Sequence, residues 1–321
     1  MHSEASDSPV WEEPASLRRA ALAQCALKRE WMARSDRYGW YVTLRILGPF
    51  FATLALAPYF WTAFGALTAL PVVLILGTYG YKISFIMHDC SHDSLFRTRG
   101  LNDRVGIACG WLVGADYFQF KRVHREHHQF NLTQRDPQFE EAGGMQGASR
   151  RYLSWHLSKA LVGGRIFGYL SGYHGSAATP STARTEKPAW GRIALVAGIQ
   201  IVIALVATGF GEVPVLALAY PAGAVTIALF LARFRTFAEH VEPAGRNLPD
   251  FVRTHRPNWF DALFFYDAHF NYHLEHHLFP SIASCHLAQV HRTYGTRIHG
   301  DLSLGGSMIS TVVNRLRQAQ S

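Results

Sequence analysis

The chain has 321 residues, of which 49% are apolar and only 17% are charged, and its formal net charge is +8. This composition is poor for a soluble surface, and no basic-aromatic module indicates a partner made of nucleic acid. None of the four cysteines has CxxC spacing, so the sequence encodes no zinc ribbon, rubredoxin or iron–sulfur cluster, and it offers no disulfide framework.

The N-terminal region is polar. Residues 1–40 contain no apolar core of the kind that a cleavable signal peptide has. A helix is expected from Ser16 to about Arg34, lying either on the membrane surface or on the rest of the protein. We therefore interpret residues 1–40 as a cytoplasmic tail with a possible interfacial helix, and residues 41–321 as a single membrane domain.

Apolar residues gather in four runs that are long enough, or nearly so, to cross a hydrocarbon layer of about 30 Å. The predicted spans are residues 46–62, 64–81, 193–210 and 213–231. None of the 31 Lys and Arg residues lies in the short connections Thr62–Gly65 and Gly209–Val213. Because an excess of Lys and Arg marks the cytoplasmic side, we expect both termini there, together with residues 82–192 and 233–321.

The predicted fold is thus an all-α integral membrane protein. Four transmembrane helices form two hairpins, and interfacial helices and a cytoplasmic helical cap complete it. Val105–Phe118 is apolar but too short to span, so it is expected as a half-inserted or interfacial helix. A helix is expected to begin near Phe120, and another to close the chain near Ser307–Gln318.

Three histidine motifs fall on the cytoplasmic side of this topology. They read His-Asp-Cys-Ser-His at 88–92, His-Arg-Glu-His-His at 124–128 and His-Leu-Glu-His-His at 273–277. On a helix, positions i, i+3 and i+4 share one face, so the imidazoles of each motif can point the same way. The candidate ligands are His88, His92, His124, His127, His128, His273, His276 and His277.

These ligands are too many for one ion, because a first-row metal takes roughly four to six. The number therefore predicts two metals side by side. Zinc proteolysis requires HExxH and a carboxylate di-iron bundle requires ExxH, and neither occurs in the sequence. A histidine-rich site for two ions of a borderline metal, with iron as the best candidate, is what the motifs favour.

The three motifs, their order and their placement around two hairpins resemble the membrane fatty acid desaturase superfamily. The resemblance covers roughly Ile46–Arg292, and HDCSHDSLF and HLEHHLFP are most similar to the acyl-lipid branch. It implies two non-haem irons held by nine histidines, the ninth from just after the fourth span. His240 stands at that place, with His269 as the competing candidate. Some relatives have an asparagine one turn before the ninth ligand, where this chain has Thr236.

The resemblance also implies the reaction. An O2-dependent desaturase would introduce a C=C bond into an acyl chain carried on a lipid, CoA or a carrier protein, with O2 as co-substrate. A hydroxylase, ketolase or acetylenase of the same superfamily, acting on an alkyl, acyl or carotenoid substrate, is the alternative. A membrane metal carrier would need ligands across the spans, which the motifs do not show.

The chain has no flavin, haem or cluster motif, so electrons are expected from a ferredoxin with its reductase, or from a separate cytochrome b5. The expected location is the bacterial inner membrane. The motifs do not determine the chain length, the acyl carrier or the bond position.

Overall fold

The computed structural model describes most of the chain. The described residues are 23, 25–131, 136–137, 149–164, 214–240, 252–298 and 304–319, together with a few positions between 194 and 205. These residues are mostly helical, and the sheet among them is a parallel pair of two-residue strands, β1 (Thr254–His255) and β2 (Leu304–Gly305). The predicted helical class is confirmed for this part of the chain.

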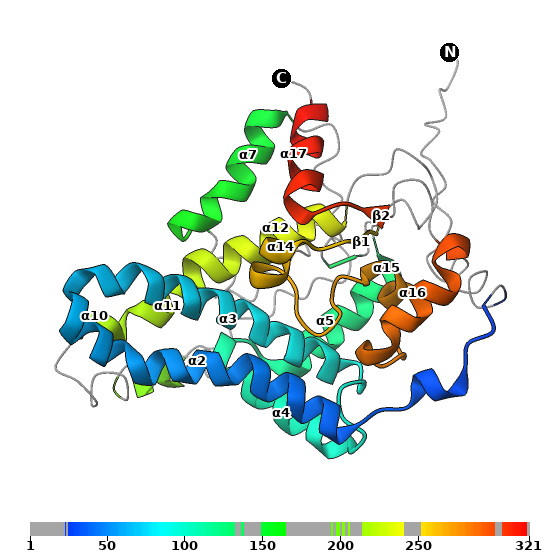
Figure 1. Cartoon of the computed structure of the whole chain (residues 1–321), viewed down its shortest axis with the longest axis horizontal. Helices are drawn as coiled ribbons and strands as arrows, with labels where there is room; N and C mark the ends of the chain where they lie inside the picture. The colour runs from blue at the N-terminus through cyan, green and yellow to red at the C-terminus, as the bar shows by residue number, and fades with distance from the viewer. Residues whose placement is uncertain are drawn as a thin grey trace, which may run out of the picture.

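The two longest helices form a hairpin. α2 (Asp36–Phe64) and α3 (Ala69–Ser91) pack side by side and are joined by the 3-10 turn η2 (Gly65–Thr68) (Figure 1). Gly65 ends α2 with a φ of 58°, a backbone conformation that favours glycine. Asp36–Ser91 is the one stretch of the described residues that is long and apolar enough to cross a membrane.

Both helices extend beyond the spans predicted from hydropathy. Residues 46–62 and most of 64–81 are helical, but α2 already begins at Asp36 and α3 continues to Ser91. The extensions lie at the same end of the hairpin, and that of α3 carries the first histidine motif. The first motif therefore lies beyond the end of the predicted span because α3 continues into it without a break.

The second predicted hairpin is described only in part. The span 193–210 lies outside the described residues, apart from scattered positions. The span 213–231 is helical from Pro214 on, and continues past its predicted end. Its elements are α10 (Pro214–Ala217), α11 (Ala219–Gly223), the π-helical turn η4 (Ala224–Ala228) and α12 (Leu229–Glu239).

α11 and η4 pack tightly on α3. A Cβ atom on Gly77 would lie 2.7 Å from the carbonyl oxygen of Gly223, so the two backbones meet with no room for a side chain. Tyr220 packs edge-to-face on Phe50 of α2, with ring centroids 4.9 Å apart, and its hydroxyl donates to the carbonyl of Leu112. These contacts fix the direction of α12, which ends beside the histidine motifs.

The second motif returns to the same end of the molecule through a turn. α4 (Arg99–Val113) packs on α3 and ends at Gly114, whose φ is 77°. α5 (Tyr117–Phe130) begins directly afterwards and is capped by the side chain of Asp116. The expectation of one helix over Val105–Phe118 was therefore wrong in its bounds. The left-handed conformation at Gly114 ends one helix, and the aspartate cap starts the next.

The remaining helices cover the histidine end. They are α7 (Arg150–Ser158) with the 3-10 turn η3 (Lys159–Val162), α14 (Trp259–Phe264), α15 (His273–Leu278), α16 (Ser284–Ile298) and α17 (Met308–Gln318). α7, α12 and α17 pack together, and the Arg315 guanidinium of α17 donates to the carbonyl of Phe237 at 3.0 Å. The predicted closing helix is confirmed as α17.

The N-terminal segment differs from its prediction. From Cys25 on, the predicted helix to Arg34 is absent, and the chain is irregular apart from one 3-10 turn, η1 (Arg29–Met32). Trp31 is buried against Tyr294 of α16, with ring centroids 5.9 Å apart. One large aromatic side chain thus holds the segment on the protein itself, and no amphipathic helical face forms there.

The close approach of α3 and α11 gives a test of the fold. Gly77→Leu should lower the free energy of unfolding by about 1–3 kcal/mol, because the new side chain has no space against Gly223. Gly48→Leu on α2 is the matched control, because nothing lies within 4 Å of its added Cβ. Thermal unfolding of the purified proteins measures both, and an equal midpoint for the two variants would contradict this packing.

Candidate metal centre

The three histidine motifs meet at one end of the α2–α3 hairpin. His88 lies on the last turn of α3 and His92 follows the helix end. The second motif lies on α5, and the third forms most of the short helix α15. Seven of the eight imidazoles are buried and His92 is half-buried. Segments far apart in the sequence therefore place their imidazoles in one interior region.

The imidazoles form two groups, which we call the first and second histidine groups. The first consists of five residues, each with a nitrogen atom within 4.8 Å of those of the others: His88, His92, His124, His128 and His276. The second meets the same condition with His127, His240 and His277. The rings of His128 and His277 stack 4.3 Å apart, so the groups are neighbours.

More imidazole nitrogens point inward than hydrogen bonds between the imidazoles can satisfy. His128 Nε2 lies 3.1 Å from both His124 Nε2 and His276 Nε2. A neutral imidazole carries one N–H, so three converging nitrogens cannot all be paired. Among the residues described, His88 Nε2 and His277 Nε2 are buried without a hydrogen-bond partner. A bound metal ion that accepts the lone pairs fits both observations.

Burial keeps these side chains in the form that binds a metal. Burial, together with neighbouring imidazoles and nearby cations, holds the pKa well below the usual histidine value for six of them: His124, His128, His240, His273, His276 and His277. At pH 7 they are neutral in the folded protein, so they offer lone pairs and no proton has to be displaced.

Carboxylates hold the far nitrogen of two imidazoles. The two oxygens of Asp136 lie 2.9 and 3.0 Å from His127 Nδ1, and both side chains are buried. Asp89 Oδ1 lies 3.1 Å from His88 Nδ1. Because a carboxylate accepts the N–H, each contact assigns the proton to Nδ1 and leaves the Nε2 lone pair for a metal. Asp136 lies in the turn after α5, where the sequence offered no signal beyond turn-forming residues.

The position after α12 contributes to the second group. His240 lies with its ring 5.0 Å from that of His127 and 5.1 Å from that of His277. His269, the competing candidate, is exposed and belongs to neither group. His273 also lies outside both groups, but its Nε2 is 3.0 Å from His240 Nε2, so it borders the second group.

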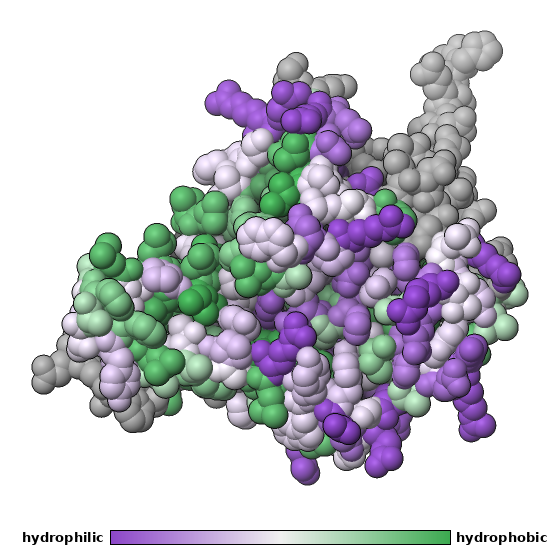
Figure 2. Space-filling model, viewed as in Figure 1, coloured by the Kyte–Doolittle hydropathy of each residue, from purple (hydrophilic) through white to green (hydrophobic). Residues whose placement is uncertain are grey.

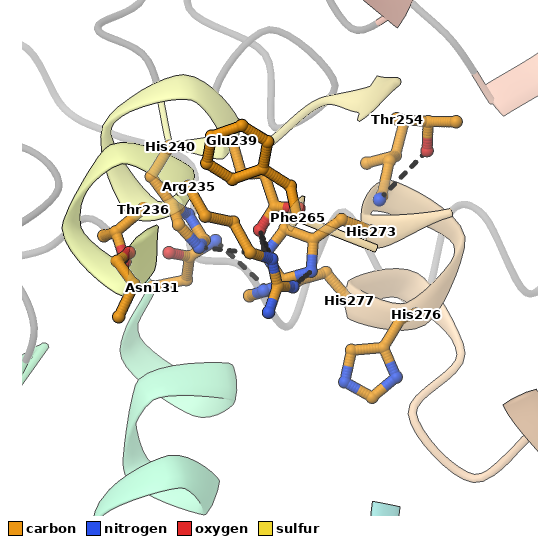
Figure 3. Close-up of polar contacts among 12 residues, drawn as sticks. Asn131, Arg235, Thr236, Glu239, His240, Thr254, Phe265, His273, His276 and His277 are labelled. Carbon is orange, nitrogen blue, oxygen red and sulfur yellow. Dashed lines mark hydrogen bonds and ion pairs between the residues drawn. The ribbon is translucent and has the colours of Figure 1, made fainter. Parts of the chain in front are cut away.

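Arg235 reaches the third motif from α12 (Figure 3). Its Nε lies 2.8 Å from Glu239 Oε2, and a terminal nitrogen lies 3.5 Å from His273 Nδ1. The guanidinium carbon is 5.1 Å from the ring centre of Phe85 and 5.0 Å from that of Phe270. Burial raises the pKa of Glu239 to about 7, and the neighbouring Arg235 opposes that rise. Arg235 thus connects α12, α3 and the segment before α15.

Thr236 does not take the place of an asparagine. Its hydroxyl donates to the carbonyl of Ala232 in its own helix, at 3.0 Å. A buried amide approaches the second group from the end of α5 instead, since Asn131 Nδ2 lies 3.4 Å from His277 Nδ1 (Figure 3). No sequence pattern pointed to Asn131, because its contact joins two motifs that are far apart in the chain.

Two other acids near the motifs connect elements of the fold. Glu275 accepts from the hydroxyl of Thr254 on β1, and its other oxygen lies 2.5 Å from His291 Nδ1 on α16. Asp267 lies 3.5 Å from the ammonium group of Lys82 on α3. Glu275 therefore anchors the third motif to β1 and α16, and Asp267 anchors the segment before the motif to α3. His291, one of the isolated histidines of the sequence, has this structural contact.

A family model described as Fatty acid desaturase matches residues 65–299, a range that contains all three motifs and His240. The chain belongs to the fatty acid desaturase family. A comparison with curated proteins finds no match. Family membership confirms the resemblance seen in the motifs and implies an oxidoreductase of the desaturase type. It agrees with a buried histidine cluster that could hold metal.

The contact between Asp136 and His127 gives a test of the centre. Asp136→Asn should lower metal affinity by about 10- to 100-fold, because an amide no longer fixes the proton on His127 Nδ1. Glu30→Gln, at an exposed carboxylate on η1, is the control. Metal retained against a graded chelator series, measured by elemental analysis, gives the result. Equal retention in wild type and Asp136→Asn would show that this carboxylate does not support a ligand.

Proposed function

We propose that this protein is an O2-dependent fatty acyl desaturase with two iron ions at the histidine groups. The observation that carries the proposal is the pair of neighbouring, largely buried groups of imidazoles at the end of an apolar helical hairpin. The first group would hold one ion. His127, His240 and His277 would hold the other, with His273 beside them. Nitrogen donors of this kind suit iron among the borderline metals.

Bound iron would supply the O2-derived oxidant that removes hydrogen from an unactivated C–H bond. The protein's own contribution is positioning and protection. Asp89 and Asp136 hold His88 and His127 in fixed tautomers, and Arg235 holds α12 against the third motif. Burial of most of the imidazoles limits the access of water to the centre.

Membrane insertion of the α2–α3 hairpin is part of the proposal. Large apolar side chains far along the hairpin are mostly exposed, among them Tyr59, Leu67 and Leu70. Hydrophobic residues gather at that end of the molecule in Figure 2, and hydrophilic residues gather at the opposite end. A hydrocarbon environment would cover this surface. We propose that residues 193–231 form the second hairpin, and that the centre faces the cytoplasm at a bacterial inner membrane.

The same ligands serve hydroxylation in other members of the superfamily, so the product decides between the two reactions. The substrate would be an acyl chain on a lipid, CoA or a carrier protein. Electrons would come from a ferredoxin with its reductase, or from a separate cytochrome b5, because the chain has no redox motif apart from the histidines.

Mass spectrometry of the acyl pool tests the function. A host that expresses the wild type with a ferredoxin system should accumulate an acyl product lighter by two hydrogens. His127→Ala should abolish that product, because a ligand of the second group is lost. His286→Ala is the control, since this histidine of α16 bonds Gln289 and belongs to neither group.

A product heavier by one oxygen, absent from His127→Ala, would replace desaturase by hydroxylase at the same centre. An acyl pool that is identical in all three hosts would contradict the proposed function under this donor system.

A further inference from the structure

A polar cleft leads from the surface to the first histidine group. It has a volume of about 370 Å³ and lies between the end of α3, one side of α5 and the turn before α16. His92 and His128 line it, and the other polar side chains of its lining include Asp93, Lys121, Arg125 and Gln129. An aqueous partner could therefore approach two imidazoles of the centre directly.

The lining of this cleft does not suit an acyl chain, because most of its side chains are polar or charged. A separate cavity beside the first group has a volume of about 10 Å³, which is too small for an acyl chain, and its lining includes Asp89 and Ser284 as well as Phe270 and Leu287. An occupant other than the substrate chain therefore has to explain the larger, polar cleft.

Three elements next to the cleft carry exposed cations. η1 is brought to its edge by Met32, whose sulfur lies 4.0 Å from Ser281 Oγ, and by Trp31, which packs on α16. Arg125 of α5 lines the cleft itself. The exposed cations on η1 and the residue before it, on α5 and on α16 are Lys28, Arg29, Arg122, Arg125, Arg292 and Arg297. α16 contains no Asp or Glu.

Carboxylates offset only part of this charge. Glu30 lies 3.8 Å from Lys28 and offsets it, and Asp93 and Asp103 each lie 3.1 Å from Lys121. Glu126 is the one carboxylate on α5, and it is only half-exposed. Among the described residues of η1, α5 and α16, cations therefore outnumber carboxylates, and a partner with a negative surface would be attracted to this basic surface.

The position of this basic surface argues against lipid headgroups as the occupant. α5 and α16 lie at the end of the molecule that is opposite the apolar tip of the hairpin, where η2 and α10 lie (Figure 1). The hydrophilic residues in Figure 2 gather at this same end. A surface so placed would face water, where a soluble protein can reach it.

We infer that the basic surface around this cleft is the docking site for the electron donor, a small redox protein with an acidic face around its redox group. The inference rests on the proposed function. Converting one CH2–CH2 unit to CH=CH with one O2 and two protons releases two waters and consumes two electrons. A one-electron donor would therefore be oxidised and released twice per product. A modest, charge-steered interface suits such repeated encounters.

Binding of an oxidised [2Fe–2S] ferredoxin to the full-length protein, without substrate, tests the inference. Arg292→Glu and Arg125→Glu should each raise the Kd by about tenfold at about 0.02 M salt, and wild-type binding should weaken at about 0.3 M salt. Arg151→Glu, at an exposed cation on α7, should leave the Kd unchanged. Arg292 lies outside both histidine groups, so its variant should keep the wild-type metal content.

A Kd that is the same in Arg292→Glu, Arg125→Glu and wild type would overturn the inference. The inference would also be overturned if these two substitutions abolished binding to vesicles of anionic lipid, or to acidic acyl carrier protein, and left ferredoxin binding unchanged. The assay needs no turnover. A protein that binds ferredoxin at this surface but forms no unsaturated acyl product would therefore refute the proposed reaction and keep the docking site.

Discussion

The structure depends on one constraint, which is that many neutral imidazoles are buried together in two neighbouring histidine groups. A buried polar atom without a partner costs about 1–3 kcal/mol, and the interior here contains His88 Nε2, His277 Nε2 and the crowded nitrogens around His128. Bound metal ions would offset that cost, so folding and metal binding are expected to be coupled. The contacts of Asp89 and Asp136 prepare the site by fixing the proton of a neighbouring imidazole.

Much of the surrounding fold serves to bring four helix ends to this place. The turn at Gly114 returns α5 to the end of α3, and the contact between Gly77 and Gly223 directs α12 toward the same region. Arg235, packed against the rings of Phe85 and Phe270, connects α12 to α3 and to the third motif. A side-chain change at these distant positions would therefore alter the positions of the imidazoles through the packing contacts.

The sequence indicated the histidine motifs and the first hairpin, because both follow from local rules. Helical spacing identified the motifs and hydropathy identified the first hairpin, whereas His240 was nominated only through the resemblance to the desaturase superfamily. The group to which each imidazole belongs could not be predicted from the face of a single helix. His124 and His128 of α5 join the first group, whereas His127 of the same helix joins the second. That division depends on where α3, α12 and α15 lie around α5.

The contacts that sequence reasoning missed all join segments that are far apart or irregular. Asp136 reaches His127 from a turn, and Asn131 reaches His277 from another motif. Hydrophobic periodicity carries no information about either contact. The N-terminal segment shows the same limit, since the spacing of Leu27 and Trp31 suggested a helix, but burial of Trp31 against Tyr294 decided the outcome. The ligand roles of the nine histidines and the number of membrane spans stay predictions.

The most direct test of the account is the metal content of the purified protein, measured together with X-ray absorption at the iron edge. The account predicts two irons per chain in a shell of nitrogen ligands. His276→Ala and His277→Ala should each lose iron, because they remove a ligand from the first and the second group respectively. One metal per chain, or an iron shell dominated by oxygen or sulfur, would contradict it.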